Sequence, residues 1–285
     1  MKDTLAYKVF IRIGVLVLLL WSLGPVYWTV ASSFTPTADF SIRPINFFPE
    51  NFTLDHYSRL FGIDIARIGG VAVFEQFRAA LLNSVVTSLG ATALCVAISA
   101  LGAYAFTRLQ FPGRKVLFLA VVATLAIPAY GVLIPLYRIM IQLQLVDTYL
   151  GVALIYVSAY LPLSLWLLRS VFEALPVSLE EAAQLDGAGR LYIFFRIVLP
   201  LTGPGLTAAA ILTFLGAWGQ YLVPLIFSPQ ATKPLTVLVP EFVTKNFIDY
   251  GLITASGSIA LVIPALVVIF LNRYLVSGLL AGSVK

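Results

Sequence analysis

The chain has 285 residues, of which 60% are hydrophobic and 11% are charged, and its mean hydropathy is +0.97. A soluble domain carries about 25% charged residues, so this chain has too few charges to cover a surface that faces water. The hydrophobicity excludes a disordered chain, and the single cysteine, Cys95, excludes a secreted fold held by disulfides. These features predict an all-α fold, a polytopic membrane helix bundle. The net charge of +5 is typical of basic cytosolic loops, and we expect no nucleic-acid partner.

Six stretches without charged residues are each long enough to cross the hydrocarbon core, which takes about 20 apolar residues. They lie at 13–38, 79–107, 116–137, 148–168, 197–232 and 250–272. The fifth stretch is longer than one helix needs and contains several prolines. Because proline suits the first turn of a helix and ends one poorly, we place this helix at about 203–227. The sequence therefore predicts six transmembrane helices, with both termini on the same side of the membrane.

The Lys and Arg residues near the spans predict the orientation, because cytosolic loops are the more basic ones. With the N-terminus in the cytosol, 11 of the 18 basic residues lie inside and 7 lie outside. Four of those seven lie in one long loop that acidic residues balance. We therefore expect both termini in the cytosol and an uncleaved first span, whose apolar stretch is too long for a signal peptide.

The spans and loops divide the chain into four segments: an N-terminal segment with the first helix, an external loop or cap, a core of five helices, and a cytosolic tail. Their bounds are 1–35, 36–78, 79–275 and 276–285. The one histidine, His56, lies in the external loop without Cys or His neighbours, so we expect no metal site. Cys95 lies within the second span, where we expect it to pack.

The cytosolic segment between the fourth and fifth spans is predicted to contain a short capped helix. Its sequence SLEE is a capping box, in which the Ser178 hydroxyl accepts from the Glu181 amide and the Glu181 side chain reaches back to the Ser178 N–H. The helix is expected to continue to about Leu185. Gly187 or Gly189 then supplies the left-handed conformation that ends it.

A helix of about two turns is only marginally stable in water, so this one is expected to dock on another surface. The small side chains of Ala182 and Ala183 would let that surface come close. The surface is either a partner protein or the membrane, on which the helix would lie as an interfacial helix. The residues alone leave both interpretations open.

The same segment resembles the EAA motif of permease subunits in binding-protein-dependent ABC importers. The match is carried, with the family's spacing, by Glu181, Ala182, Ala183, Gly187, Ile197, Leu199 and Pro200. The resemblance extends over nearly the whole chain and is to the carbohydrate branch that contains the second permease of maltose-type systems. Further matching segments are 25–28, 104–108, 111–113 and 272–274. One departure is Gly219-Gln220 after Trp218, where the family usually has Asn-Glu.

The resemblance implies a type I ABC importer permease fold, in a bacterial or archaeal inner membrane. It implies that the chain forms half of an ATP-driven pathway for a sugar or oligosaccharide, in a heteromeric complex. The partners would be a second permease subunit, two ATPase subunits, an external solute-binding protein and membrane lipid. The loop at 173–200 would couple the chain to an ATPase through Ser178, Glu180, Glu181, Ala182, Ala183, Asp186, Gly187, Ile197, Leu199 and Pro200.

The chain is not expected to be an enzyme or to bind a cofactor. It contains no G-x-x-x-x-G-K-[ST] loop that could hold ATP phosphates, and no pair of carboxylates within a predicted span. ATP and Mg would therefore bind in the partner ATPase subunits.

Six residues are candidates for the solute pathway because aromatic faces, amides and hydroxyls hold sugars. They are Asn83, Thr87, Tyr130, Trp218, Gln220 and Tyr221. The alternative is that the aromatic residues lie at membrane interfaces and the polar residues join helices.

The alternative function is a secondary transporter or channel for a small polar solute. Ion-coupled carriers usually place ionisable groups within the membrane. Asp and Glu are absent from all six predicted spans, which disfavours ion coupling.

Overall fold

The computed structural model describes residues 5–41, 47–63, 71–244 and 248–281, which form two compact units. The first unit comprises 1–78 and 238–262, and the second comprises 79–237 and 263–285. The helices α4 (Val71–Arg108), α13 (Leu235–Glu241) and α14 (Tyr250–Ala281) contribute residues to both units. The predicted division of the chain at 35, 78 and 275 stays a prediction.

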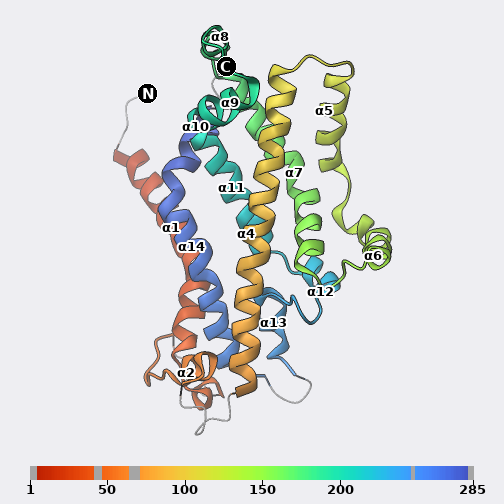
Figure 1. Ribbon diagram of the computed structural model, residues 1–285. Coiled ribbons are helices and arrows are strands. Elements are labelled where there is room, and N and C mark those ends of the chain that lie inside the picture. Colours follow the sequence, from red (N-terminus) through yellow and green to blue (C-terminus); the bar gives the residue numbers. More distant parts are fainter. Residues whose placement is uncertain (1–4, 42–46, 64–70, 245–247, 282–285) are drawn as a thin grey trace. The chain divides into compact units, whose positions relative to one another are not determined.

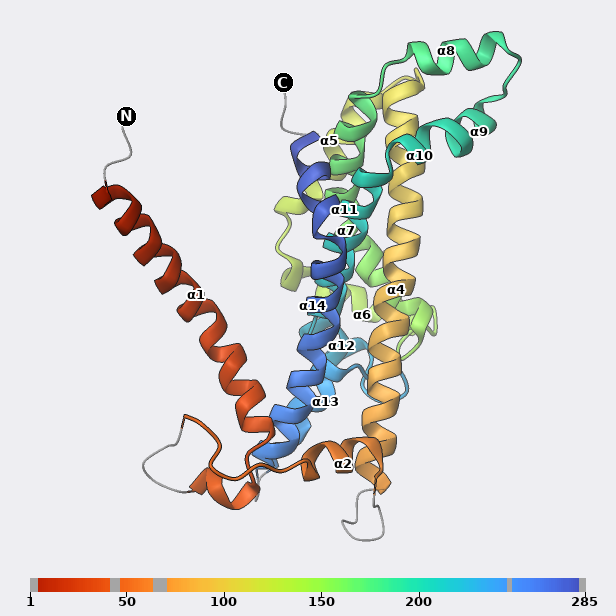
Figure 2. The same ribbon diagram turned by 90° about the vertical axis from the view of Figure 1, so that its left-hand side faces the viewer.

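The first unit contains the long helix α1 (Leu5–Ser33), the 3-10 helix η1 (Thr37–Ser41), the short helix α2 (Asp55–Phe61) and the start of α14. Figure 2 shows α1 as a single continuous helix. Its apolar residues allow a helix through the whole predicted first span, with Pro25 inside it.

The short helix α2 is held by buried polar contacts within the first unit. The His56 side chain, 2% exposed, places Nε2 2.9 Å from the Thr35 carbonyl oxygen. Arg59 forms an ion pair of 2.8 Å with Asp249, just before α14. The segment predicted as an external cap therefore contains a helix that side-chain contacts hold in place, and His56 makes one of these contacts. Among the described residues, no group of His, Cys, Asp or Glu side chains is arranged to hold a metal ion.

The second unit is a bundle of helices around α4, α7 (Tyr149–Glu173) and α11 (Gly203–Trp218). Figures 1 and 2 show α8 (Ser178–Leu185) beyond the C-terminal end of α4, with α9 (Arg190–Ile193) level with the last turns of α4. They show α12 (Leu222–Phe227) near the opposite end of α7. The shorter elements are α5 (Arg114–Ala123), η2 (Thr124–Ala126), η3 (Ala129–Val132), α6 (Leu133–Gln142), the π-helical η4 (Phe194–Val198) and α10 (Leu199–Leu201).

Small residues let α7 and α11 pack closely. A Cβ atom at Gly205 would lie 2.8 Å from the Val171 side chain, and one at Gly216 would lie 2.5 Å from the Tyr160 ring. Close approach at small residues is how helices associate where lipid removes the hydrophobic driving force. Cys95 is fully buried with Thr213 3.9 Å away, so the prediction that it packs is confirmed.

Four described helices are long and apolar enough to cross a membrane, at Tyr7–Ser33, Val73–Arg108, Tyr149–Glu173 and Tyr250–Leu271. Two further pairs of helices pass the same test together but are bent, by 94° between α5–η2 and η3–α6 and by 77° between α9–α10 and α11. The described residues therefore provide up to six spans if each bent pair counts as one, which agrees with the predicted bundle.

Two predicted spans are not continuous helices, and in this respect the prediction is wrong. The span at 116–137 breaks at Ile127, which is extended (ψ 126°) because it precedes Pro128. The helix predicted at 203–227 ends at Trp218, and a separate helix, α12, follows Gly219-Gln220. The Thr236 hydroxyl donates to the freed Gln220 carbonyl at 2.6 Å. At the other end of the chain, α14 continues through the predicted tail to Ala281, and 282–285 lie outside the described residues.

Candidate functional site

The short helix α8 lies at one end of the second unit (Figure 1). A buried ion pair holds it there. Glu180 is 4% exposed, and its carboxylate accepts from Nε of Arg108 at 2.5 Å. The hydroxyl of Tyr104 lies 3.3 Å from the other carboxylate oxygen. Because Arg108 and Tyr104 belong to the last turns of α4, the pair joins α8 directly to a long apolar helix.

Arg108 also binds the end of α7. Its second terminal nitrogen donates to the carbonyl oxygens of Phe172 and Leu175, both at 3.0 Å. The last carbonyls of a helix have no partner within that helix, and a cation satisfies them well. One guanidinium therefore ties together α4, α7 and α8, and the buried charges are paired and hydrogen-bonded.

The predicted capping box is wrong. Helix α8 begins at Ser178 itself, the preceding Val177 is already helical (φ −64°, ψ −27°), and no side chain caps the helix. The Glu181 amide donates to the Val177 carbonyl at 3.1 Å instead. Since Pro176 and Val177 start the turn, Ser178 takes the first helical position and cannot act as the cap. The end of the helix is as predicted, because Gly187 has φ +85°.

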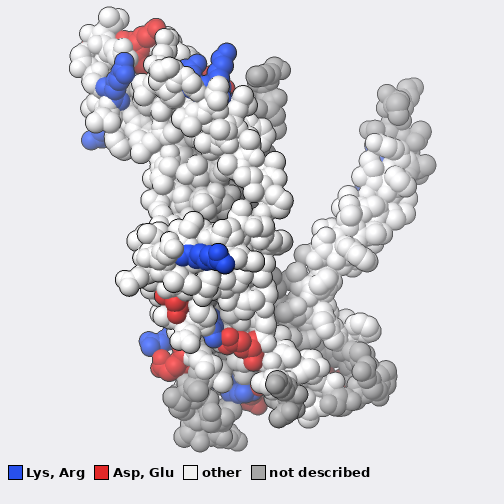
Figure 3. Space-filling view, turned by 90° about the vertical axis from the view of Figure 1, so that its right-hand side faces the viewer, with Lys and Arg blue, Asp and Glu red and all other residues white. Residues whose placement is uncertain are grey.

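The surface of α8 carries apolar side chains that the chain itself does not cover. Leu185 is 90% exposed, and Leu179 and Ala182 are also exposed. Leu191 and Tyr192 of α9 are exposed as well. Figure 3 shows that charged side chains also gather at this end of the second unit, next to a broad uncharged surface. The two faces of α8 therefore differ: Glu180 points into the chain, and the leucines do not.

The remaining predicted coupling residues lie at the tip and at the base of the same loop. Glu181, Asp186 and Gly187 are exposed, and Asp186 follows the last residue of α8. Ile197 and Leu199 are half-buried against the core at the base. Of the other predicted coupling residues, Ala183 is half-buried and Pro200 is exposed.

Two of the predicted pathway residues, Asn83 and Thr87, are buried and have hydrogen-bond partners within the chain. The Asn83 amide donates to the carbonyls of Ala231 (3.1 Å) and Lys233 (2.9 Å), and its oxygen accepts from the Tyr149 hydroxyl at 2.6 Å. The Thr87 hydroxyl donates to the Asn83 carbonyl at 2.6 Å. This geometry favours the alternative interpretation, in which they join segments of the chain.

The other four pathway candidates have different surroundings. Trp218 is buried with its ring stacked 5.7 Å from Phe214. The Gln220 amide donates to the Tyr160 hydroxyl at 2.8 Å. Tyr130 and Tyr221 are exposed and free to meet another molecule.

Asp147, which sequence reasoning missed, organises the loop after α12. Its carboxylate accepts from the backbone N–H groups of Ala231 (2.8 Å) and Thr232 (3.0 Å), and its own N–H donates to the Phe227 carbonyl at 2.8 Å. Burial acts to raise the pKa of Asp147, but these N–H groups lower it below its ordinary value overall. The sequence offered one signal for Asp147: it directly precedes Thr148. Thr148 caps α7, because its side chain accepts a hydrogen bond from the Gly151 N–H.

Comparison with known proteins gives a consistent result. The family described as binding-protein-dependent transport system inner membrane component matches residues 96–280. The chain is similar to the osmoprotective compounds uptake permease protein GgtD of Synechocystis sp., with 40% identity over 72% of this chain and 70% of that protein. It is also similar to the trehalose transport system permease protein SugB of Mycobacterium tuberculosis, with 33% identity over 93% of this chain and 93% of that protein.

The fold is similar to that of a solved protein as well. A crystal structure of a bacterial ABC transporter involved in the import of the acidic polysaccharide alginate matches with a TM-score of 0.78 and 21% identity. The match covers 95% of this chain and 97% of that chain. It confirms the predicted all-α membrane helix bundle and its permease fold.

Proposed function

Because the chain belongs to the family of binding-protein-dependent transport system inner membrane components, we propose that it forms half of the pathway of an ATP-driven importer for a sugar or oligosaccharide. The family makes the chain a multi-pass permease subunit of an inner membrane. Its likeness to permeases for trehalose and for osmoprotective compounds supports a sugar or another osmoprotective compound as the solute.

The observation that carries the coupling proposal is the contrast between the two faces of α8. Glu180 is buried against Arg108, whereas Leu185 is 90% exposed on the same short helix. An exposed leucine on a helix fixed by a buried ion pair is suited to a groove on another protein. A displacement of α8 by an ATPase subunit would then reach α4 and α7 through Arg108. This favours a protein partner over the membrane surface for α8.

The complex would contain a second permease subunit, two ATPase subunits and an external solute-binding protein. ATP and Mg would bind in the ATPase subunits, and this chain would carry out no catalysis and bind no cofactor. Both termini and α8 would be cytosolic. A Leu185→Cys variant in a Cys95→Ser background tests the orientation, since a membrane-impermeant thiol reagent should label it only from the cytosolic side. Labelling from the outside would show that the orientation is opposite to the proposed one.

Two of the six predicted pathway residues remain our candidates for solute contact. Tyr130 and Tyr221 have exposed rings. Unchanged solute selectivity in Tyr130→Ala and Tyr221→Ala would remove both from the pathway.

A substitution on the exposed face of α8 tests the coupling proposal. Leu185→Asp should lower ATP-driven uptake in vesicles by about tenfold or more, because a charge replaces an apolar contact at the centre of an interface. The unfolding temperature of the chain should not change, since Leu185 contacts solvent. Gln110→Asp, in the exposed turn after α4, is the matched control and should transport normally. Full uptake by Leu185→Asp would contradict the proposal.

A further inference from the structure

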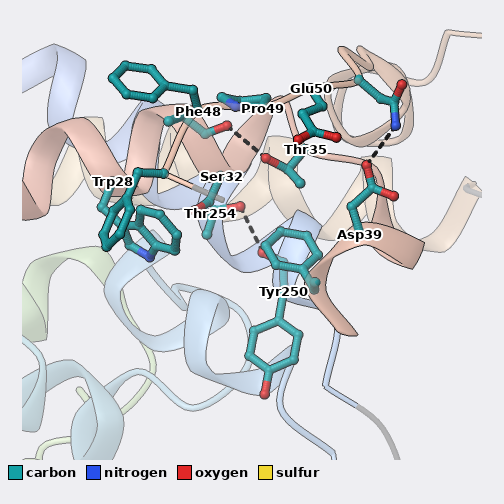
Figure 4. A pocket seen from close by; sticks show the side chains of 13 residues that line it. Trp28, Ser32, Thr35, Asp39, Phe48, Pro49, Glu50, Tyr250 and Thr254 are labelled. Atoms are coloured by element: carbon teal, nitrogen blue, oxygen red, sulfur yellow. Dashed lines mark hydrogen bonds between the residues drawn. The ribbon is translucent and has the colours of Figure 1, made fainter. Parts of the chain in front are cut away.

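A cavity of about 310 Å³ lies in the first unit, between the end of α1, the segment that follows it and the start of α14 (Figure 4). Its apolar walls are aromatic, with Trp28 from α1, Phe47 from the following segment and Tyr250 from α14. The Trp28 and Tyr250 residues are 38% and 48% exposed, so their rings are accessible.

The aromatic walls are fixed by other rings. The Trp28 and Phe47 rings lie 5.7 Å apart in an edge-to-face arrangement. The Tyr250 ring packs on the Phe40 ring at 5.5 Å, with 31° between the ring planes. Edge-to-face pairs hold rings in defined orientations. The cavity therefore presents ring faces whose positions are set by the protein.

Polar side chains complete the lining. The Asn51 amide donates to the Asp39 carboxylate at 3.1 Å. Figure 4 shows Asp39 at one side of the cavity. The Thr35 hydroxyl donates to the Ala31 carbonyl at 3.2 Å, which leaves its lone pairs as acceptors. Among the described residues that line the cavity none is Lys or Arg, so an anionic ligand would lack an ionic partner there.

A sugar ring has apolar C–H faces and a rim of hydroxyl groups that both donate and accept. Its faces need flat apolar walls, and its rim needs carboxylate, amide and hydroxyl groups. The cavity offers both, and its volume is at the lower end of small-molecule sites, which span about 300–1,000 Å³. We propose that this cavity binds a single sugar ring, with Trp28 as the stacking wall and Asp39 and Asn51 as hydrogen-bonding partners.

This site would be distinct from the coupling site and would lie at the outer side of the membrane. Its placement there and its relevance to sugar rest on the proposed function. The permease itself would then bind a sugar at the membrane surface, at a site separate from that of the solute-binding protein. Loss of the site would then raise the solute concentration needed for uptake without altering the requirement for ATP.

The test measures the binding of trehalose, maltose and glucose to the reconstituted complex without its solute-binding protein. Saturation-transfer NMR and calorimetry detect the binding. At least one of these sugars should bind, and Trp28→Ala should weaken its binding by about tenfold or more. Trp21→Ala is the matched control, because Trp21 lies on the same helix, is 82% exposed and does not line the cavity. Asn51→Leu should weaken binding without changing the aromatic walls.

Three results would overturn the proposal. They are no binding of any of the three sugars by the wild-type complex, equal binding by wild type and Trp28→Ala, or binding of choline at the same site in preference to the sugars. In each case ATP-driven uptake by the complete wild-type complex would still support the proposed function. Failure of that uptake with sugar binding intact would contradict the proposed function alone.

Discussion

Glu180 and Arg108 are separated by 72 residues in the chain and form a buried ion pair at the point where α8 meets α4. Their side chains are 6% and 10% exposed. A second hydrogen bond, from the Tyr104 hydroxyl of α4 to the other oxygen of the Glu180 carboxylate, joins the same two helices. The position of α8 thus depends on a residue that lies two candidate spans earlier in the chain.

Glu180→Gln should destabilise the chain by roughly 3 kcal/mol, because it leaves the Arg108 guanidinium buried without a counter-charge. The free energy of unfolding of the purified chain in detergent measures this effect. ATP-driven uptake should fall with it, since α8 loses its anchor. A stability equal to that of the wild type would show that the pair does not hold α8.

Glu181→Gln should leave the free energy of unfolding unchanged, because the Glu181 side chain is exposed and does not cap the helix. We expect it to weaken association with the ATPase subunit if the carboxylate meets a basic residue there. Co-purification of the ATPase subunits with Glu180→Gln and with Glu181→Gln compares the two residues. It separates a role within the chain from a contact with the ATPase subunit. Wild-type assembly and transport by Glu181→Gln would exclude a role for its charge.

Asp147→Asn should lower the free energy of unfolding by about 1–2 kcal/mol at pH 7, because an amide replaces a charged acceptor of backbone N–H groups. The pKa of Asp147 is lower in the folded chain than in the unfolded chain. Its stabilisation is therefore complete above the unfolded value of about 3.9 and is lost as pH falls through the folded pKa. The difference between variant and wild type should shrink below about pH 4. A difference that stays constant down to pH 2, or the same loss in the exposed control Glu75→Gln, would refute this role.

Gly151→Ala should destabilise the chain by about 1–3 kcal/mol. A Cβ atom there would clash with the Leu145 carbonyl oxygen and would lie 3.0 Å from the Thr148 hydroxyl. Backbone cannot move aside as a flexible side chain can. Gly90→Ala is the control, because nothing lies within 4 Å of a Cβ atom at Gly90 and alanine suits a helix interior. Thermal unfolding of the two variants side by side should separate them, and equal unfolding temperatures would contradict the clash.

The long helices were predictable because local information defines them. Uncharged stretches of sufficient length located α1, α7 and the start of α14, and prolines located the start of α11. The breaks were harder to predict, because the carbonyl that the break at Gly219-Gln220 frees accepts a hydrogen bond from Thr236. That partner lies elsewhere in the chain and leaves no local signal.

The candidate site was only partly predictable for the same reason. The motif located α8 and its glycine end, but the relation of Glu180 to Arg108 depends on how α4 and α8 pack. The capping-box pattern pointed to Ser178, whereas the turn at Val177 moved the helix start by one residue. Likewise, Asn83 is polar and within a span, but its three hydrogen bonds come from segments that the sequence could not place beside it.

The most direct test of the account is sugar uptake into sealed vesicles that contain this chain, with its partner subunits added or omitted. Sugar uptake should require the second permease, the ATPase subunits, the solute-binding protein and ATP together, and Glu180→Gln should reduce it. Uptake by this chain alone, or uptake by the full complex without ATP, would contradict an ATP-driven permease and would support a channel or secondary transporter.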